Sequence, residues 1–446
     1  MEACCGSLII PSGEVPGDGK NLPQIPDPAR AKPFRSSTPP TTGQEMDSPA
    51  VTDDLLAEIF LRLPTAADLV RASAACVSFR RLVTSRSFLR LFRSLHSPPF
   101  LGFLNHNGFH PALPPHPSAP AARDVSLAAD FSFSFLPFHD TWIVRDVRDG
   151  RVLLDRVPKD GAGKESPVFT ELAVCDPLHR RCLLLPQIPH DLTAAVEHPL
   201  RVEFERWCEP FLVPPGASEE ETEETSFGVI WMAQCKTKLV AFLFSSSIGE
   251  WRAIASQGWD DLLLGTGVST MSSRSPVFFG RQYACGYFYW VMDWREKLLV
   301  LDTVKEEFSI ISLPPDYRRP PIAIVDAGEG RPGMIALREN IADGTSELYY
   351  TIRQNEGETP NHWQMEKIIP LDSGYRYYIR GATERYLLLL RSEDEPISSS
   401  LEMPDLECFS LDIKTLQLER VCRLKHHILS AHIYTNFPPS LSSQTL

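Results

Sequence analysis

The sequence predicts a multidomain chain of the α+β class, with a small N-terminal unit of three helices followed by a large all-β domain. Residues 53–92 carry apolar side chains at helical spacing between capping residues, and strand signals recur from about residue 100 onward. The 39 prolines and 25 glycines favour short strands and loops over long helices. The length of 446 residues fits two or three domains.

Residues 1–47 predict a disordered leader, because they hold eight prolines and five glycines and almost no periodic apolar pattern. Met1-Glu2 lacks the basic start of a secretory signal, and the apolar piece 7–10 stops at Pro11. No apolar run reaches the roughly 18 residues that a membrane helix needs. We therefore expect an intracellular protein, in the nucleus, the cytoplasm or both, with no membrane partner.

The first predicted helix follows Thr52, a suitable N-cap, and has Asp53 and Asp54 in its first turn, where the helix dipole favours negative charge. Pro64 ends this helix because it lacks a backbone donor and clashes with the preceding turn. One face of the helix is apolar and consists of Leu55, Leu56, Ile59, Phe60 and Leu63.

Two further helices are predicted after Pro64. The segment 65–68 resembles a capping box and starts a helix that runs from about Ala66 to Cys76. The third helix starts near Ser78, loosens at 84–87 and then resumes its apolar pattern up to residue 95. A cluster of roughly 45 residues buries too little apolar surface to be stable alone, so we expect it to need a partner or a neighbouring domain.

Residues 48–96, about a tenth of the chain, resemble the F-box family. Val51-Thr52 stands where the family has Leu-Pro, and Ala75 and Phe79 stand where it has Val and Trp, so we expect weakened partner binding. The positions that match the family pattern are Asp53-Asp54-Leu55-Leu56, Glu58-Ile59, Leu63-Pro64, Asp68-Leu69, Cys76, Arg80-Arg81-Leu82 and Phe88.

The resemblance implies that this unit docks onto a Skp-type adaptor and, through it, onto a cullin. The chain would then be the substrate-recognition subunit of a ubiquitin ligase, which is a non-catalytic role, and its target protein stays unknown. Each docking residue that becomes fully buried would contribute about 1.5–3 kcal/mol. The residues expected on the adaptor-binding face, or directly supporting it, are Leu55, Ile59, Leu63, Pro64, Leu69, Cys76 and Phe79.

Charge and cysteine spacing exclude several other classes. Residues 97–446 hold 33 basic and 47 acidic side chains, a balance of −14, so we expect no nucleic-acid partner. The five arginines between residues 78 and 93 are interpreted as a solvated helix face. The ten cysteines include no CxxC pair, which argues against both a disulfide framework and a zinc site.

From residue 97 to 437 the sequence predicts close to twenty strands. The segment 97–120 should hold a first strand and then a loop, and Asp149-Gly150 between two apolar runs indicates a hairpin. We expect surface loops at 217–225 and 392–400 and a flexible tail at 438–446.

A weak repeat runs through these strands. Asp176, Asp302 and Asp412 each follow an apolar strand and precede a polar turn and a second strand, and degenerate copies lie near residues 245 and 355. Their spacings of 69, 57, 53 and 57 residues are typical of propeller blades, so the sequence predicts five to seven blades. A pair of β-sandwiches or an irregular β-rich fold is the alternative. The arrangement also resembles the F-box-associated β-propeller domains of plants.

No segment of the sequence predicts a catalytic site. Residues 328–333 match G-x-G-x-x-G, but Pro332 stands where a helix should open, so we interpret the segment as a hairpin loop. The carboxylate pairs at 260–261 and 306–307 are adjacent and would point to opposite faces of a strand. Ligand-like residue types cluster only at Cys422, His426, His427 and His432, where we expect no metal.

We therefore assign no catalytic, cofactor-binding or metal-binding residue and expect no cofactor. The alternative function is a propeller enzyme, such as an oxidase or lyase, in which the F-box-like segment is regulatory. A third possibility is an adaptor-binding protein that works outside ubiquitination.

Overall fold

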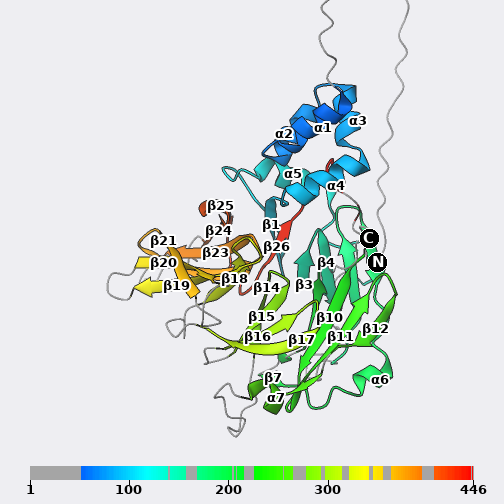
Figure 1. The fold of residues 1–446 in the computed structure, drawn as a ribbon, viewed down its shortest axis with the longest axis vertical. Coiled ribbons are helices and arrows are strands. Elements are labelled where there is room, and N and C mark those ends of the chain that lie inside the picture. Colours follow the sequence, from blue (N-terminus) through cyan, green and yellow to red (C-terminus); the bar gives the residue numbers. More distant parts are fainter. Residues whose placement is uncertain are drawn as a thin grey trace, which may run out of the picture. The chain divides into compact units, whose positions relative to one another are not determined.

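In the computed structural model, four short helices are followed by a six-bladed β-propeller (Figure 1). The predicted leader, the loop at 217–225 and most of the loop at 392–400 lie outside the described residues. The structure describes residues 52–446 except for 139–140, 157–167, 203–204, 207, 215–225, 255, 265–277, 293–296, 314–320, 341–344, 355–362, 394–405, 443 and 445.

The helices begin at residues that cap them. The Thr52 hydroxyl accepts a hydrogen bond from the Leu55 amide at 3.4 Å, and the Thr65 hydroxyl accepts one from the Asp68 amide at 3.1 Å while donating to the Asp68 carboxylate at 2.6 Å. The predicted starts of the first two helices are therefore confirmed. The four helices are α1 (Asp53–Leu61), α2 (Ala66–Ser73), α3 (Val77–Val83) and α4 (Arg86–Leu95).

Two details of the helical prediction were wrong. Helix α2 ends at Ser73, and Cys76 instead caps α3, because its thiol accepts a hydrogen bond from the Phe79 amide at 3.5 Å. The segment that was treated as a resumption of the third helix is a separate helix, α4, which Ser85 caps. The unit therefore has four helices rather than three.

Five blades each consist of one sheet of consecutive antiparallel strands, and the prediction of a propeller with five to seven blades is confirmed. The five sheets are β3–β6 (Trp142–Arg148, Arg151–Arg156, Leu172–Asp176, Arg181–Leu184), β9–β13 (Cys208–Val213, Gly228–Gln234, Lys238–Ser245, Glu250–Ala253, Gln257–Gly258), β14–β17 (Phe278–Ala284, Tyr287–Met292, Lys297–Asp302, Glu307–Ser312), β18–β21 (Ile322–Asp326, Pro332–Asn340, Thr345–Arg353, Trp363–Pro370) and β22–β25 (Tyr375–Ala382, Tyr386–Glu393, Leu406–Asp412, Gln417–Leu424).

The sixth blade joins the two ends of the β domain. Strand β26 (His432–Thr435) pairs with β1 (Phe100–Asn105), which also pairs with β2 (Gly108–Pro111), so segments more than 300 residues apart lie side by side (Figure 1). This closure leaves the ring without an open end between its first and last blades. The shorter elements outside the blades are α5 (Ala119–Ala128), α6 (His190–Thr193), α7 (Trp259–Leu263), β7 (Arg201–Val202) and β8 (Glu205–Arg206).

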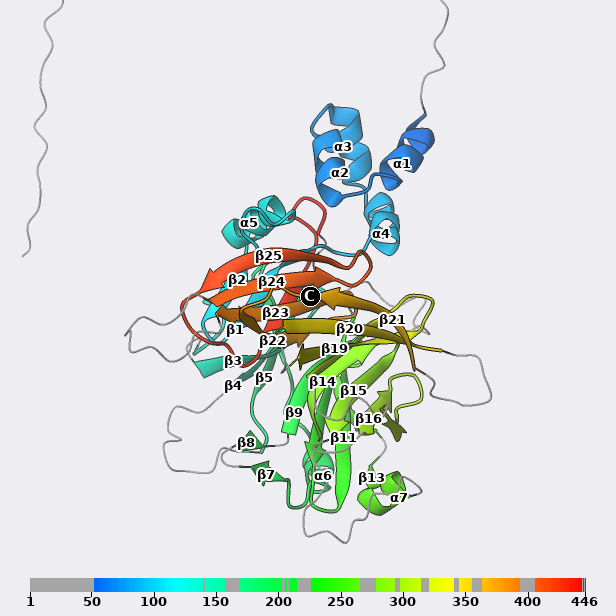
Figure 2. The same ribbon diagram turned by 90° about the vertical axis from the view of Figure 1, so that its left-hand side faces the viewer.

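Apolar side chains between neighbouring blades form most of the core. Phe211 of β9 packs edge-on against Phe288 of β15, with ring centroids 4.7 Å apart, and Trp290 is fully buried in the same cluster. Helix α5, which the sequence prediction missed, contacts β1 and β2 (Figure 2). It buries Ala122 and Val125 there. Each blade is therefore stabilised mainly by its neighbours.

The repeated aspartate motif marks the same place in three blades, the turn between the third and fourth strands. Asp302 accepts hydrogen bonds from the amides of Val304 and Lys305 at 2.9 and 3.0 Å, and Asp412 accepts one from the Lys414 amide at 2.9 Å. The predicted role of these aspartates in their own turns is confirmed. The degenerate copy near residue 245 is the turn between β11 and β12, and Asn355 lies outside the described residues.

These turns also share a residue with positive φ, four positions after the aspartate. Its amide donates to the carbonyl at the start of the turn, at 2.8 Å for Glu306 and 2.7 Å for Leu416. Both residues have φ of +56°, and Gly249 has φ of +80° at the equivalent place. Glycine adopts this conformation at little cost, whereas other residues are strained in it.

The end of the chain packs against the helices. We expected a flexible tail after residue 437, but Phe437 and Leu441 are 6% and 1% exposed and belong to the same apolar cluster as Phe60 and Phe92. The Arg93 guanidinium donates two hydrogen bonds to the Leu441 carbonyl, at 3.0 and 2.6 Å. Residues 437–441 therefore complete the core of the helical unit. The described part of the chain contains no helix that is long and apolar enough to cross a bilayer.

Candidate functional site

A cavity of about 1130 Å³ lies along the axis of the propeller. Its wall is formed mainly by the innermost strand of each blade, including β3, β14, β18, β22 and β26. Its volume is in the range of ligand pockets in proteins. Because binding sites in propellers lie along the axis and on the loops, this cavity is the candidate binding site of the β domain.

The two ends of the cavity differ in chemistry. One end of the cavity is apolar. The residues there lie near the starts of the inner strands, or at or just after the ends of β15 and β17, and they are Phe279, Met292, Leu313, Pro321 and Leu429. Residues at the ends of the inner strands make the other end charged. We call this second group the charged mouth, and it consists of Arg148, Asp149, Tyr283, Asp326 and Glu384.

A buried ion network lies between the two ends. The Arg281 guanidinium on β14 is 3.1 Å from the Asp146 carboxylate on β3 and 2.7 Å from the Glu209 carboxylate on β9. Asp146 also accepts a hydrogen bond from the Leu212 amide at 2.9 Å, and Glu209 accepts one from the Trp290 indole. The network therefore connects three neighbouring blades. Within it, the Arg281 guanidinium is paired with both carboxylates.

In the charged mouth, Glu384 lies near the Asp149 and Asp326 carboxylates and near the Arg148 guanidinium. Arg148 stacks over the Tyr283 ring, 4.3 Å from its centroid, and lies 3.9 Å from the Glu384 carboxylate. Asp326 accepts hydrogen bonds from the Gly328 amide at 2.7 Å and the Cys285 thiol at 3.5 Å. Asp149 is at the turn of the predicted hairpin, with φ of +51°, and the prediction of that hairpin is confirmed.

The electrostatics of the mouth are dominated by burial and by like charges. Burial raises the pKa of Glu384, nearby Arg148 lowers it, and Asp149 and Asp326 raise it further. Burial, Glu384 and Asp149 raise the pKa of the Tyr283 phenol to about 12, although nearby Arg148 lowers it. Burial and Asp326 raise the pKa of the Cys285 thiol to about 12, so this cysteine is a neutral thiol rather than a nucleophile.

The raised pKa of Glu384 predicts a pH effect on stability. The folded protein holds this proton more tightly than the unfolded chain, so the contribution of Glu384 to stability falls as pH rises from about 4.5 through the raised pKa. We expect Glu384→Gln to be more stable, relative to wild type, at pH 7 than at pH 4. Urea unfolding at both pH values measures this, and a stability difference that does not change with pH would contradict the assignment.

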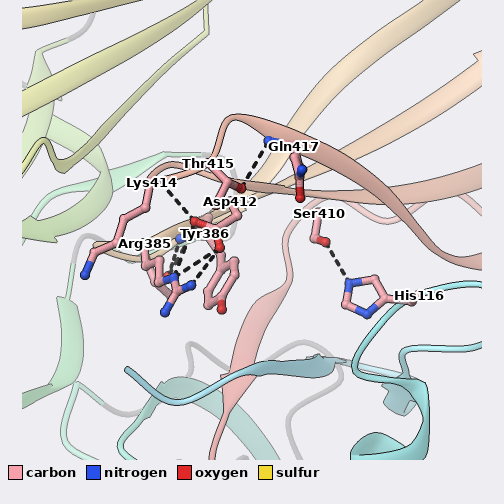
Figure 3. Close-up of polar contacts among 9 residues, drawn as sticks. His116, Arg385, Tyr386, Ser410, Asp412, Lys414, Thr415 and Gln417 are labelled. Carbon is pink, nitrogen blue, oxygen red and sulfur yellow. Dashed lines mark hydrogen bonds and ion pairs between the residues drawn. The ribbon is translucent and has the colours of Figure 1, made fainter. Parts of the chain in front are cut away.

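The turn of blade β22–β25 borders the mouth, and its aspartate is paired with an arginine (Figure 3). Arg385 donates to both oxygens of the Asp412 carboxylate, the shortest contact being 2.8 Å, and it stacks over the Tyr386 ring. Lys414 extends away from Asp412 in this view. Farther along the blade, the buried His116 imidazole lies 3.0 Å from the Ser410 hydroxyl, and burial lowers its pKa to about 4.

Metal and nucleotide sites find no support in the geometry. Across the residues that the structure describes, no three His, Cys, Asp or Glu side chains are placed to hold a metal ion, and this includes Cys422 and its neighbouring histidines. Residues 327–331 form the hairpin loop between β18 and β19, as predicted, with Asp326 opposite Pro332.

The residues predicted to bind an adaptor fall into two groups. Leu55 and Ile59 are one turn apart on α1, each 49% exposed, and Pro64 and Cys76 are also exposed. By contrast, Leu69 is fully buried inside the helical unit, and Leu63 and Phe79 are half-buried, with the Phe79 ring 5.0 Å from the Phe60 ring. The structure also exposes Val77, at 78%, which the sequence prediction did not select.

Sequence reasoning did not find the charged mouth. Its residues come from four blades and are separated by up to 236 positions, so no local pattern connects them. Only Asp149 carried a signal, through the Asp-Gly hairpin. The rest became visible once the inner strands were arranged around one axis.

No family model matches the chain, and no curated protein does. Solved structures that are similar include the WD40 domain of SCAP from fission yeast (8% identity, 64% of this chain and 65% of that one, TM-score 0.28) and YCF48 from Cyanidioschyzon merolae (13%, 63% and 80%, TM-score 0.30). A post-proline cleaving enzyme from Rickettsia typhi is also similar (7%, 83% and 57%, TM-score 0.32). The chain thus spans about two thirds of the SCAP domain and just over half of the cleaving enzyme. The described chain is a six-bladed β-propeller with an N-terminal helical unit.

Proposed function

We propose that this protein is a non-catalytic substrate receptor of a cullin-type ubiquitin ligase, with the helical unit docking onto a Skp-type adaptor and the propeller holding a target protein. The observation that carries the proposal is the apolar face of α1. Leu55 and Ile59 are half exposed, although the core of the unit is already filled, in part by Phe437 and Leu441. An apolar face of this kind is stabilised when a partner covers it.

Three further features support the proposal. The helix-ending residues and the charged residues that resemble the F-box pattern lie in the helical unit that contains α1. Thr52, Thr65 and Cys76 cap its first three helices. The tail at residues 437–441 joins the helical unit to the last strand of the propeller through Phe437. A target held next to a docked conjugating enzyme has a high effective concentration at that enzyme. This mechanism requires no catalytic residue in the chain.

Co-purification tests the proposal. We expect the full chain to retain a Skp-type adaptor and a cullin, and the double change Leu63→Ala, Pro64→Ala to reduce both. Retention of the adaptor without the cullin would favour a role outside ubiquitination. If the wild type retains no adaptor, or if the folded double variant retains it equally well, the docking proposal fails.

A further inference from the structure

Two cysteines face each other across the outer hairpin of blade β3–β6. Cys175 is on β5 and Cys182 is on the outermost strand, β6, and the two residues are directly opposite in the antiparallel register. Both are free thiols, of which Cys175 is buried and Cys182 is exposed. Directly opposite residues of an antiparallel pair have their side chains on the same face of the sheet. The hairpin therefore holds a buried thiol beside an exposed one.

The hydrogen bonds of this hairpin place the two cysteines where opposite strands come closest. The Leu185 amide donates to the Leu172 carbonyl at 2.9 Å, so these two residues form a hydrogen-bonded pair. Along an antiparallel ladder such pairs alternate with non-hydrogen-bonded pairs, whose Cα atoms are about 4.5 Å apart. Cys175 and Cys182 are three positions farther along each strand and so form a non-hydrogen-bonded pair. A disulfide accepts Cα separations of about 4.4–6.8 Å, so it can form here with little movement of the backbone.

The equivalent positions in three other blades hold apolar pairs that pack. Each of these pairs is adjacent to the residues that close the blade's outer turn, and all six side chains are buried or half-buried: Phe244 opposite Trp251, Leu301 opposite Phe308 and Leu411 opposite Leu418. Cys182 is exposed instead. Packing therefore does not account for a cysteine at this position, whereas the opposite thiol of Cys175 gives it a chemical partner.

We propose that Cys175 and Cys182 form a reversible disulfide by exchange with a low-molecular-weight disulfide of the glutathione type. The Cys182 thiolate attacks one sulfur of the small disulfide, which releases one small thiolate and leaves a mixed disulfide on Cys182. The Cys175 thiolate then attacks the Cys182 sulfur and releases the second small thiolate. The two protein thiols are thereby oxidised, the small disulfide is reduced, and the two protons of the protein thiols pass to the released thiolates.

Burial determines both the order and the speed of these steps. Exchange begins at Cys182, because Cys175 is fully buried and an oxidant cannot reach it. Burial also raises the pKa of both thiols, so they are mainly protonated at neutral pH and react slowly. The pair is therefore suited to a lasting modification rather than to rapid redox catalysis. Once formed, the disulfide links the outermost strand of the blade covalently to its neighbour.

A second pair of opposite cysteines is an internal control. Cys408 on β24 and Cys422 on β25 are also directly opposite, but they are 0% and 7% exposed. Neither of these thiols is as open to an oxidant as Cys182. We therefore expect the Cys408–Cys422 pair to stay reduced in the folded protein.

Disulfide mapping of the full chain tests the proposal. The folded protein is incubated with oxidised glutathione at about pH 8, the remaining thiols are alkylated, and the tryptic peptides are identified by mass spectrometry. Cleavage after Arg180 and Arg181 separates the two cysteines, so only a disulfide can join their peptides. We expect these joined peptides to be at least about tenfold more abundant than joined peptides of the control pair, and to be lost on treatment with dithiothreitol.

Two outcomes of the mapping would overturn the proposal. One is a Cys182 that stays a thiol, or that carries only glutathione while Cys175 remains a thiol. The other is a Cys408–Cys422 disulfide that forms as readily, because exposure would then not select the pair. Disulfide formation needs no adaptor, so its failure would leave the docking proposal unaffected.

Three variants, each checked for folding by circular dichroism, test the order of the steps. Cys175→Ser should stop at the mixed disulfide of Cys182 with glutathione, and Cys182→Ser should leave Cys175 unmodified. Cys76→Ser removes another exposed thiol and should leave the disulfide unchanged. Uptake of glutathione by Cys175 in folded Cys182→Ser, or loss of the disulfide in folded Cys76→Ser, would contradict the mechanism.

Discussion

Replacing Phe437 with alanine should destabilise the helical unit by about 3–5 kcal/mol, the usual cost of removing a buried phenylalanine side chain. Phe437 is 6% exposed, its ring centroid is 6.0 Å from that of Phe92, and it lies in one apolar cluster with the core of α1 to α4. The loss is large because the unit is small and has few other buried aromatic side chains to compensate. Urea unfolding followed at a helix-sensitive wavelength measures the effect.

Leu429→Ala is the matched control, because Leu429 is also close to the C-terminus but is 87% exposed. It should change stability by no more than about 0.5 kcal/mol. A loss of less than about 1 kcal/mol in Phe437→Ala would mean that the tail does not stabilise the helices.

Asp146→Ala should have a similarly large effect on the propeller, at about 3–5 kcal/mol. The Asp146 side chain accepts a hydrogen bond from the Leu212 amide at 2.9 Å and pairs with Arg281 at 3.1 Å, and the residue is 8% exposed. Its removal leaves a buried amide without a partner and a buried guanidinium with one carboxylate instead of two. Thermal and urea unfolding of the whole chain measure the loss.

Glu58→Ala provides the comparison for a removed carboxylate. The Arg62–Glu58 pair is 2.5 Å long, but its side chains are 77% and 59% exposed, so its loss should cost about 0.5 kcal/mol or less. If the two variants lost similar stability, the network between the blades would be no more important than a surface ion pair.

Local signals in the sequence were sufficient to predict the starts of the first two helices and the blade turns. Thr52 and Thr65 satisfy amides within three residues of themselves, and Asp302 and Asp412 bind amides of their own turns. Such contacts depend on short spacings, which a sequence displays directly. For the same reason the repeat of these turns predicted the propeller.

Contacts between distant segments could not be predicted in this way. The pairing of β26 with β1 and the packing of Phe437 on Phe92 join opposite ends of the chain. The ending of the third helix at Val83 was missed because the apolar pattern resumes after residues 84–87, where Ser85 in fact caps a new helix. Leu69 was selected for the docking face or its direct support, and its buried side chain belongs to the core of its own unit.

Binding of a purified Skp-type adaptor to the full chain tests the central claim most directly, with the change placed on α1. Ile59→Lys replaces a half-exposed residue in the last third of the helix, where a cation suits the helix dipole. Ile368→Lys places the same change at a similarly exposed site, 44% against 49%, on β21 of the propeller. We predict that Ile59→Lys weakens adaptor binding by about tenfold or more while Ile368→Lys binds like wild type. Equal adaptor affinity of both folded variants would contradict docking through the helical unit.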